Sequence, residues 1–237
     1  MTPMPSGMLL VYKPPGVTSH DVVQLVRRKL AVRRIGHTGT LDPIAEGLLI
    51  LLVGRATRFQ RAFQAHEKTY QAILRLGTQT DTADADGTPT RTAPIPALER
   101  EQVAKVLASF RGPLSQTPPA YSAVKVKGRP AYWWARRQQT VTLAPRVVHL
   151  AEIALVALTP ETITFRVRCS AGTYVRTLAE SIAERLGTVG QLAHLVRLRI
   201  GEWSLDDAKP LSWFQDVNPQ SIISQLKPCE SLQALTP

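Results

Sequence analysis

The sequence has 237 residues, 44% of them hydrophobic and 20% charged, which is the composition of a globular protein with one large domain or two small ones. Its 29 lysines and arginines outnumber the 18 aspartates and glutamates, and the resulting net charge of +11 favours a polyanionic partner. No apolar run approaches the roughly 20 residues of a membrane-spanning helix, and the first residues lack the basic region and apolar core of a secretory signal. We therefore expect a cytoplasmic protein that does not bind membranes.

The first part of the chain predicts a strand followed by an amphipathic helix. Residues 8–12 read as a short strand, and Thr18 with Asp21 forms a capping box for a helix whose apolar residues recur at helical spacing. The other side of this helix and its exit are basic, with Arg27, Arg28, Lys29, Arg33 and Arg34. Such a run is either a solvated face or a binding surface for a polyanion.

Two further strands and a polar loop follow. Residues 48–53 predict a buried strand, and residues 69–77 predict another that contains Tyr70 near its beginning. The loop 77–87 is rich in aspartate, but counting it as a calcium-binding loop puts Thr82 and Ala93 at the first and last ligand positions. We therefore expect no metal site there. Residues 98–112 predict an amphipathic helix that stops at Gly112.

The segment 113–146 mixes proline turns, aromatic residues and cations. Its aromatic residues are Tyr121, Tyr132, Trp133 and Trp134, and its basic residues are Lys125, Lys127, Arg129, Arg136, Arg137 and Arg146. Such a mixture suits splayed or single-stranded nucleic acid, because bases stack on aromatic rings and phosphates pair with cations. The alternative is that the two tryptophans are core residues of a small helical hairpin.

The last third predicts an antiparallel pair of strands, a helix and a final strand. Residues 147–158 and 162–170 form the pair, and in the second strand Cys169 falls on the buried side of an alternating pattern. A helix ending at Gly187 and a strand over 194–203 follow. Cys169 and Cys229 have neither the spacing nor the histidine partner of a zinc site, so we expect free thiols. Overall the pattern favours an α+β fold with a mixed, largely antiparallel central sheet flanked by helices.

The stretch GHTGTLDPIAEG, residues 36–47, places one carboxylate in a glycine-rich loop. It matches neither common phosphate-binding motif. Asp42 followed by Pro43 is also a common way to start a helix, so a purely structural N-cap is a strong alternative. Tyr70 could equally be a core aromatic, and Arg176 a surface cation. Arg176 enters a helix at its N-terminus, where a cation is unfavourable and often has a carboxylate partner elsewhere.

Five segments taken together resemble the TruB-type tRNA pseudouridine synthases. They are residues 36–59, 68–87, 118–132, 169–187 and 194–201, and they occur in the order of that family. The resemblance implies a pseudouridine synthase fold, with a catalytic domain over 1–206, a thumb-like insertion at about 113–146 and a short C-terminal tail over 207–237.

The resemblance also implies a chemistry. These enzymes break the bond between N1 of a uridine and its ribose, turn the uracil and rejoin it through C5, with no cofactor and no metal. Asp42 would be the catalytic carboxylate, attacking the base or the ribose or assisting a glycal route, and Arg176 would pair with it. Tyr70 would stack on the target base, Leu195 would pack beneath Tyr70, and Tyr174 would line the pocket.

The implied substrate is the uridine at position 55 in the T-arm of tRNA, which must be flipped out of the folded RNA. His37 would fill or brace the vacated space, Lys125 would contact the substrate, and the basic residues named above would bind the RNA backbone in a salt-dependent way. We expect a monomer with no obligatory protein partner.

The sequence departs from the family in two places, and two other functions are alternatives. Many relatives have Thr or Ser where this sequence has Glu46, and many continue into a PUA-type RNA-binding domain that we do not expect here, which implies recognition centred on the T-arm. An RNA-guided relative of the dyskerin type is one alternative function. An RNA-binding chaperone is another, but it would leave the set of Asp42, Tyr70 and Arg176 unexplained.

Overall fold

The computed structural model describes residues 5–228 of the chain, so Cys229 lies outside the described residues. The chain divides into two compact units, one formed by Met1–Thr69 with Val196–Pro237 and the other by Tyr70–Leu195. Two strands, β4 (Lys68–Leu76) and β12 (Gly190–Ile200), carry the chain from one unit to the other. Among the described residues, no helix is long and apolar enough to cross a membrane.

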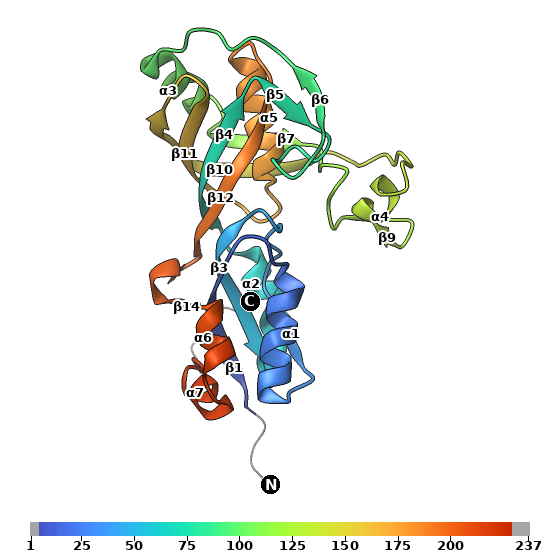
Figure 1. The fold of residues 1–237 in the computed structure, drawn as a ribbon, viewed down its shortest axis with the longest axis vertical. Coiled ribbons are helices and arrows are strands. Elements are labelled where there is room, and N and C mark those ends of the chain that lie inside the picture. Colours follow the sequence, from blue (N-terminus) through green and yellow to red (C-terminus); the bar gives the residue numbers. More distant parts are fainter. Residues whose placement is uncertain (1–4, 229–237) are drawn as a thin grey trace. The chain divides into compact units, whose positions relative to one another are not determined.

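The first unit is built around the antiparallel pair of β1 and β3 (Figure 1). Its elements are β1 (Gly7–Lys13), α1 (Ser19–Leu30), β2 (Ile35–His37), β3 (Glu46–Val53), the 3-10 helix η1 (Gly54–Phe59), α2 (Gln60–Ala65), the end of β12, β13 (Trp203–Ser204), the 3-10 helix η2 (Leu205–Asp207), β14 (Lys209–Pro210), α6 (Leu211–Asp216) and α7 (Pro219–Ser224). The strand order is β14-β1-β3-β12, and β2 also pairs with β3. The predicted strand over 48–53 is therefore confirmed.

Both faces of this pair are covered, which explains why β3 is a continuous run of apolar residues. Helices α1, α6 and α7 pack on one face, where Leu211, Phe214 and Ile222 join the core. Residues of η1 and α2 pack on the other face together with Trp203. The capping box predicted for α1 is confirmed: the Thr18 hydroxyl accepts from the backbone N–H of Asp21, and the Asp21 carboxylate accepts from the N–H of Thr18.

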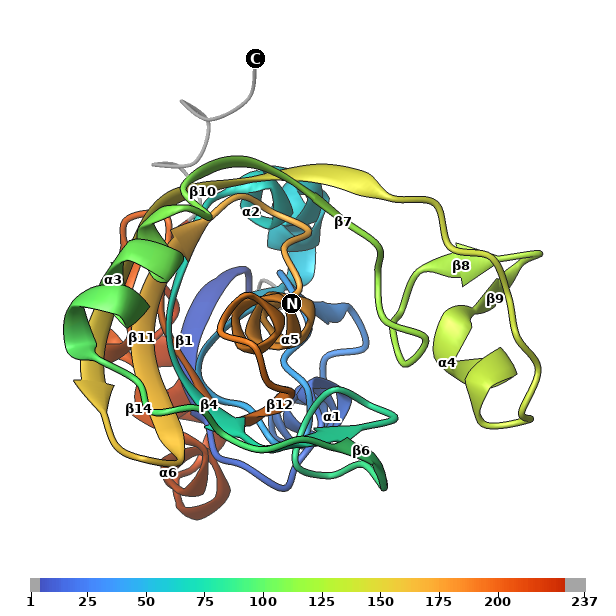
Figure 2. The ribbon, with the colours of Figure 1, turned by 90° about the horizontal axis from the view of Figure 1, so that it is seen from above.

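The second unit has a curved sheet in the order β12-β4-β11-β10-β7, with α5 lying inside the curve (Figure 2). Its other elements are β5 (Thr78–Thr80), β6 (Pro89–Thr92), α3 (Arg100–Ala108), β7 (Gly112–Gln116), β8 (Lys125–Val126), β9 (Arg129–Pro130), α4 (Ala131–Ala135), β10 (Arg146–Leu158), β11 (Thr162–Cys169) and α5 (Val175–Arg185). Strands β10 and β11 form the predicted antiparallel pair, and Cys169 is a buried free thiol, as predicted.

Helix α3 is shorter than predicted. It ends at Ala108, and Phe110 and Arg111 donate to Leu107 and Ala108 in tight turns. Gly112 does not stop the helix; with a φ of +99° it begins strand β7. Local apolar spacing placed the helix correctly but could not reveal that the next residues pair with β10.

The segment between β7 and β10 leaves the sheet. Both views show β8, β9 and α4 set apart from the rest of the second unit (Figures 1 and 2). Here β8 and β9 form a small hairpin followed directly by α4. The predicted fold class is confirmed: the protein is α+β, and its mixed sheet is largely antiparallel and flanked by helices.

Candidate active-site residues

Asp42 lies in a loop of the first unit between β2 and β3, and it does not cap a helix. Its carbonyl accepts from the N–H of Ala45 in a hydrogen-bonded turn, and strand β3 begins at Glu46. The N-cap interpretation is therefore wrong, because the chain after Pro43 turns into a strand that pairs with β1 from Gly47 to Val53. The Asp42 residue is half-buried. The loop presents a carboxylate without the help of a helix dipole.

A buried lysine joins this loop to the turn that follows β1. The Lys13 side chain is fully buried, and its ammonium donates to the carbonyls of Pro14 at 2.9 Å, Val17 at 2.7 Å and Pro43 at 3.5 Å. Desolvation, followed by the nearby Arg197, lowers the pKa of Lys13 to about 8, against the opposing effect of Asp42 and two other carboxylates. No motif in the sequence marks Lys13 as a residue that supports this loop.

Glu46, the residue without a role in the sequence analysis, accepts a short hydrogen bond from the Tyr12 hydroxyl. This bond, burial and the negative charge of Glu46 together raise the pKa of Tyr12 to about 12. Glu46 thus joins the start of β3 to the neighbouring strand β1. No local sequence signal predicts this contact, because the two residues are 34 positions apart.

His37, at the end of β2, is fixed through both its ring and its backbone. Its Nδ1 accepts from the N–H of Gly39 at 3.3 Å, and its carbonyl accepts from the Gln60 side chain at 3.1 Å. Burial, followed by the charges of Arg197 and His20, lowers the pKa of His37. His37, the last residue of β2, and Asp42, in the loop that follows, therefore belong to the same unit.

The other predicted site residues belong to the second unit, and Arg176 is the most constrained of them. It lies in the first turn of α5, is 5% exposed, and donates from its two terminal nitrogens to the carbonyls of Thr82 and Tyr121, each at 2.8 Å. Its Nε lies 3.6 Å from a carboxylate oxygen of Asp84, which is also buried. The surface-cation alternative is wrong. A carboxylate partner was expected and is present in Asp84, which the sequence analysis had placed only in a polar loop.

Tyr174 begins α5 and is fixed through its backbone. Its N–H donates to the side-chain oxygen of Gln116 at 3.0 Å, and its carbonyl accepts from the same amide at 3.2 Å. Tyr70 in β4 is half-buried and Leu195 in β12 is buried. Lys125 is exposed in the β8–β9 hairpin. Asp42 belongs to the first unit and Arg176 to the second, so their predicted pairing stays a prediction.

Of the basic residues of the first unit that are predicted to bind RNA, some are half-buried and bond to the backbone, and others are exposed. Arg27 donates to the carbonyl of Ile35, and Lys29 donates to the carbonyls of Gln215 and Val217, so both also brace the fold. Arg28, Arg33 and Arg34 are exposed.

Sequence reasoning missed a second basic stripe beside them. Arg55, Arg58 and Arg61 are all exposed, at intervals of three residues along η1 and into α2. Side chains three apart eclipse in a 3-10 helix, so Arg55 and Arg58 project from the same side. Arg34 reaches this element by donating to the hydroxyl of Thr57 at 2.6 Å. The spacing of the arginines in the sequence is the signal that could have found the stripe.

In the segment between β7 and β10, cations stack on aromatic rings. The guanidinium of Arg137 lies 3.7 Å from the centre of the Trp133 ring, and Arg129 lies 5.5 Å from it. Trp134 instead donates to the carbonyl of Val126 at 3.1 Å and holds α4 on the hairpin. Both tryptophans are half-buried, so neither is a fully buried core residue, and the hairpin is one of strands with a short helix.

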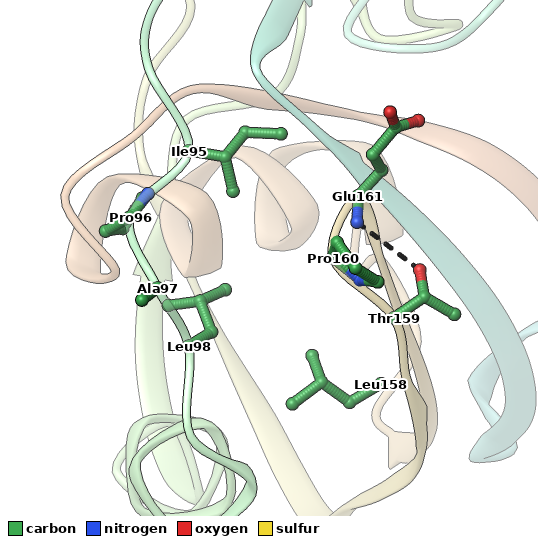
Figure 3. Close-up of a pocket in the computed structure, with 8 residues that line it drawn as sticks. All are labelled: Ile95, Pro96, Ala97, Leu98, Leu158, Thr159, Pro160 and Glu161. Carbon is green, nitrogen blue, oxygen red and sulfur yellow. Dashed lines mark hydrogen bonds between the residues drawn. The ribbon is translucent and has the colours of Figure 1, made fainter.

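A cleft of about 700 Å³ lies in the second unit, and its lining includes none of the predicted site residues (Figure 3). It is lined by Ile95, Pro96, Ala97, Leu98, Leu158, Thr159, Pro160 and Glu161. Within residues 5–228, no three histidine, cysteine or acidic side chains are grouped so that they could hold a metal ion.

Comparison with known proteins identifies the family. Residues 27–175 match the model described as TruB family pseudouridylate synthase, N terminal domain. The chain is 42% identical to the tRNA pseudouridine synthase B of Opitutus terrae over 94% of this chain and 92% of that protein. It is 44% identical to the protein of the same description from Heliobacterium modesticaldum, over 97% and 75%.

A solved structure described as a Cbf5-Nop10-Gar1 complex matches 94% of this chain and 60% of its own chain, with a TM-score of 0.70 and 26% identity. The resemblance drawn from the five sequence segments is thereby confirmed, together with the pseudouridine synthase fold that it implied. The chain is an enzyme and belongs to the TruB family of tRNA pseudouridine synthases.

Proposed function

We propose that this enzyme converts the uridine at position 55, in the T-arm of tRNA, into pseudouridine, with Asp42 as the catalytic carboxylate. The observation that carries the assignment of Asp42 is its place in a loop whose backbone is bonded on both sides to buried groups of the first unit. Residues 1–206 form the catalytic domain in this proposal, with the thumb-like insertion at about 113–146, and α6 and α7 from the segment that follows pack on its core.

The reaction exchanges one bond for another within the same nucleotide. The bond between N1 and C1′ breaks, C5 bonds to C1′, C5 loses a proton and N1 gains one. No electrons leave or enter, so the isomerisation needs general acid–base and nucleophilic or electrostatic assistance only. Asp42 supplies that assistance by attacking the base or the ribose, or by assisting a glycal route.

The remaining site residues bind and orient the base in this proposal. Arg176 pairs with Asp42 while its other donors stay on backbone carbonyls of its own unit. Tyr70 stacks on the uracil, Leu195 packs beneath it and Tyr174 lines the pocket. His37, whose pKa is lowered by burial, braces the position from which the uridine is flipped.

RNA binding rests on exposed cations outside the site. Arg28, Arg33, Arg34 and the stripe of Arg55, Arg58 and Arg61 supply charge on the first unit, and Lys125 with the cation-stacked Trp133 supplies charge and an aromatic face on the second. Such contacts bind phosphates and stack bases. We place the enzyme in the cytoplasm, acting as a monomer on the T-arm stem-loop without a protein partner.

The structural likeness to a chain from a Cbf5-Nop10-Gar1 complex favours a second candidate, an enzyme that acts within an assembly. One experiment separates the two. The purified protein alone is incubated with an unmodified tRNA transcript, and pseudouridine is mapped by carbodiimide-dependent reverse-transcription stops. A stop at the T-arm uridine supports the stand-alone enzyme. No stop where the RNA demonstrably binds refutes it.

The role of Asp42 is tested by Asp42→Asn, which keeps the shape of the side chain and removes its charge. The variant is expected to make no pseudouridine while its affinity for the transcript stays within a few fold. A comparable loss of binding would show that Asp42 acts mainly in RNA binding or in folding.

A further inference from the structure

Arg197 is the largest fully buried side chain of the described residues, with 1% of its surface exposed. It lies on β12, where its buried neighbours Leu195 and Ile200 are apolar, and an aliphatic side chain would fill the same space without the cost of burying a charge. Its guanidinium therefore needs an explanation that its volume does not provide.

The guanidinium binds three backbone carbonyls from two sides of the Asp42 loop. Its Nε donates to Leu48 at 2.7 Å, one Nη donates to Gly39 at 3.1 Å, and the other lies 3.4 Å from the carbonyl of Thr40. Leu48 follows the loop in β3, whereas Gly39 and Thr40 precede Asp42. A planar fork with donors on three nitrogens can hold both limbs at once, which a lysine ammonium on its flexible stem does less well.

The remaining bonds of the loop complete a bracket around Asp42. Both the N–H and the carbonyl of Leu41 bond to the hydroxyl of Ser19, at 2.9 and 3.2 Å. The carbonyl of Pro43 accepts from the N–H of Gly16 at 2.8 Å and lies 3.5 Å from the Lys13 ammonium. The residues immediately before and after Asp42 are thus tied to α1 and to the turn that follows β1.

The backbone of Arg197 is itself fixed to the strand that leaves the loop. Val196 pairs with Glu46 and Arg197 with Gly47 in the parallel ladder between β12 and β3. Its side chain therefore links this ladder to Gly39 and Thr40, on the other side of the loop.

We propose that Arg197 is a positioning residue for Asp42. It fixes the position of the catalytic loop relative to strands β3 and β12 through its hydrogen bonds to three backbone carbonyls, without touching the RNA. This inference rests on the proposed role of Asp42. A displacement of about 1 Å in a reacting group can cost on the order of 100-fold in rate, so loss of the bracket should lower kcat while the affinity for RNA is kept.

The charge of Arg197 also reaches His37, and this gives a readout apart from activity. Arg197 is the second cause, after burial, of the lowered pKa of His37. Replacement by lysine keeps the charge and alters the fork, whereas replacement by methionine removes both. The two variants therefore separate loop geometry from electrostatics.

The test compares Arg197→Lys and Arg197→Met with Arg199→Met, an exposed arginine on the same strand whose side chain donates to the carbonyl of Glu202. Single-turnover pseudouridine formation on unmodified tRNA, RNA affinity and the NMR titration of the His37 ring are measured at a temperature where circular dichroism shows a folded protein. Arg197→Lys should lose about 10- to 100-fold in rate, with affinity within three-fold of wild type and an unchanged His37 titration. Arg197→Met should lose at least as much rate and show a raised pKa of His37, and Arg199→Met should match wild type.

A rate for Arg197→Lys within about two-fold of wild type would overturn the inference, as would a loss of affinity as large as the loss of rate. If Arg197→Met does not fold, the lysine variant still decides. A wild-type protein that makes no pseudouridine, or an Asp42→Asn variant that retains activity, would instead overturn the proposed function, so the two failures are distinguishable.

Discussion

Gly47, at the junction of the Asp42 loop and β3, should be among the least replaceable residues of the first unit. Its φ is +107°, and a Cβ built there would lie 2.4 Å from the carbonyl oxygen and 2.7 Å from the nitrogen of Arg197. Because both are backbone atoms of the neighbouring strand, no side-chain rotation relieves the overlap, and Gly47→Ala must open the parallel ladder between β3 and β12.

The cost can be worked from these contacts. An L-residue forced to positive φ costs about 1–2 kcal/mol, and each hydrogen bond lost from the ladder or from the Arg197 fork adds about 1 kcal/mol. With two or three such bonds disturbed, Gly47→Ala should lower the free energy of unfolding by about 3–5 kcal/mol.

The matched control is Gly16→Ala. Gly16 also has a positive φ, +82°, but nothing lies within 4 Å of a Cβ built on it. It should lose only the conformational part, about 1–2 kcal/mol. Urea unfolding, followed by circular dichroism and tryptophan fluorescence, measures both. Equal losses for the two variants would refute the reasoning, because the close approach of Gly47 to Arg197 would then carry no energy.

Three further changes test the other contacts. Glu46→Gln should bring the pKa of Tyr12 from about 12 back towards its ordinary value of 10. The stabilisation from the raised pKa is present below pH 10 and is lost as the pH rises to about 12. Tyrosinate absorbance should therefore develop at a lower pH in the variant, and an unchanged titration would contradict the hydrogen bond. Arg58→Ala should weaken tRNA binding and reduce the slope of log affinity against log salt by about 1, whereas an unchanged slope would remove this stripe from the RNA-binding surface. Asp84→Ala should lower the free energy of unfolding by about 3 kcal/mol, since it removes the buried carboxylate that lies beside the Arg176 guanidinium, and thermal unfolding no different from wild type would show this ion pair to be unimportant.

Local periodicity and capping predicted much of the fold because the signals are short-range. The box of Thr18 and Asp21, the alternation that buries Cys169 and the apolar run of β3 all lie within a few residues of the structures they specify. The same local rules failed at Asp42, where Asp-Pro is typical of a helix start but the following residues pair with β1. A strand partner distant in sequence overrode the local preference.

The contacts that build the candidate site are long-range, and therefore composition and spacing could not supply them. Arg176 meets Asp84 across 92 positions of sequence and Tyr121 across 55, and Arg197 meets Gly39 across 158. The resemblance to a family named Asp42, Tyr70 and Arg176 but said nothing of Arg197, Lys13 or Tyr12, whose partners are mainly backbone carbonyls or a single carboxylate. Such partners leave no mark on a sequence motif.

The cations of this chain divide into two classes with opposite requirements. A net charge of +11 suggests RNA binding by the whole set, yet Lys13, Arg176 and Arg197 are buried and donate to backbone carbonyls. Burial of a charge is costly and is offset only when every donor finds an acceptor. The exposed arginines should therefore tolerate exchange for lysine with little loss of RNA binding. The same exchange at the buried Arg176 or Arg197 should reduce the reaction rate or the stability of the protein.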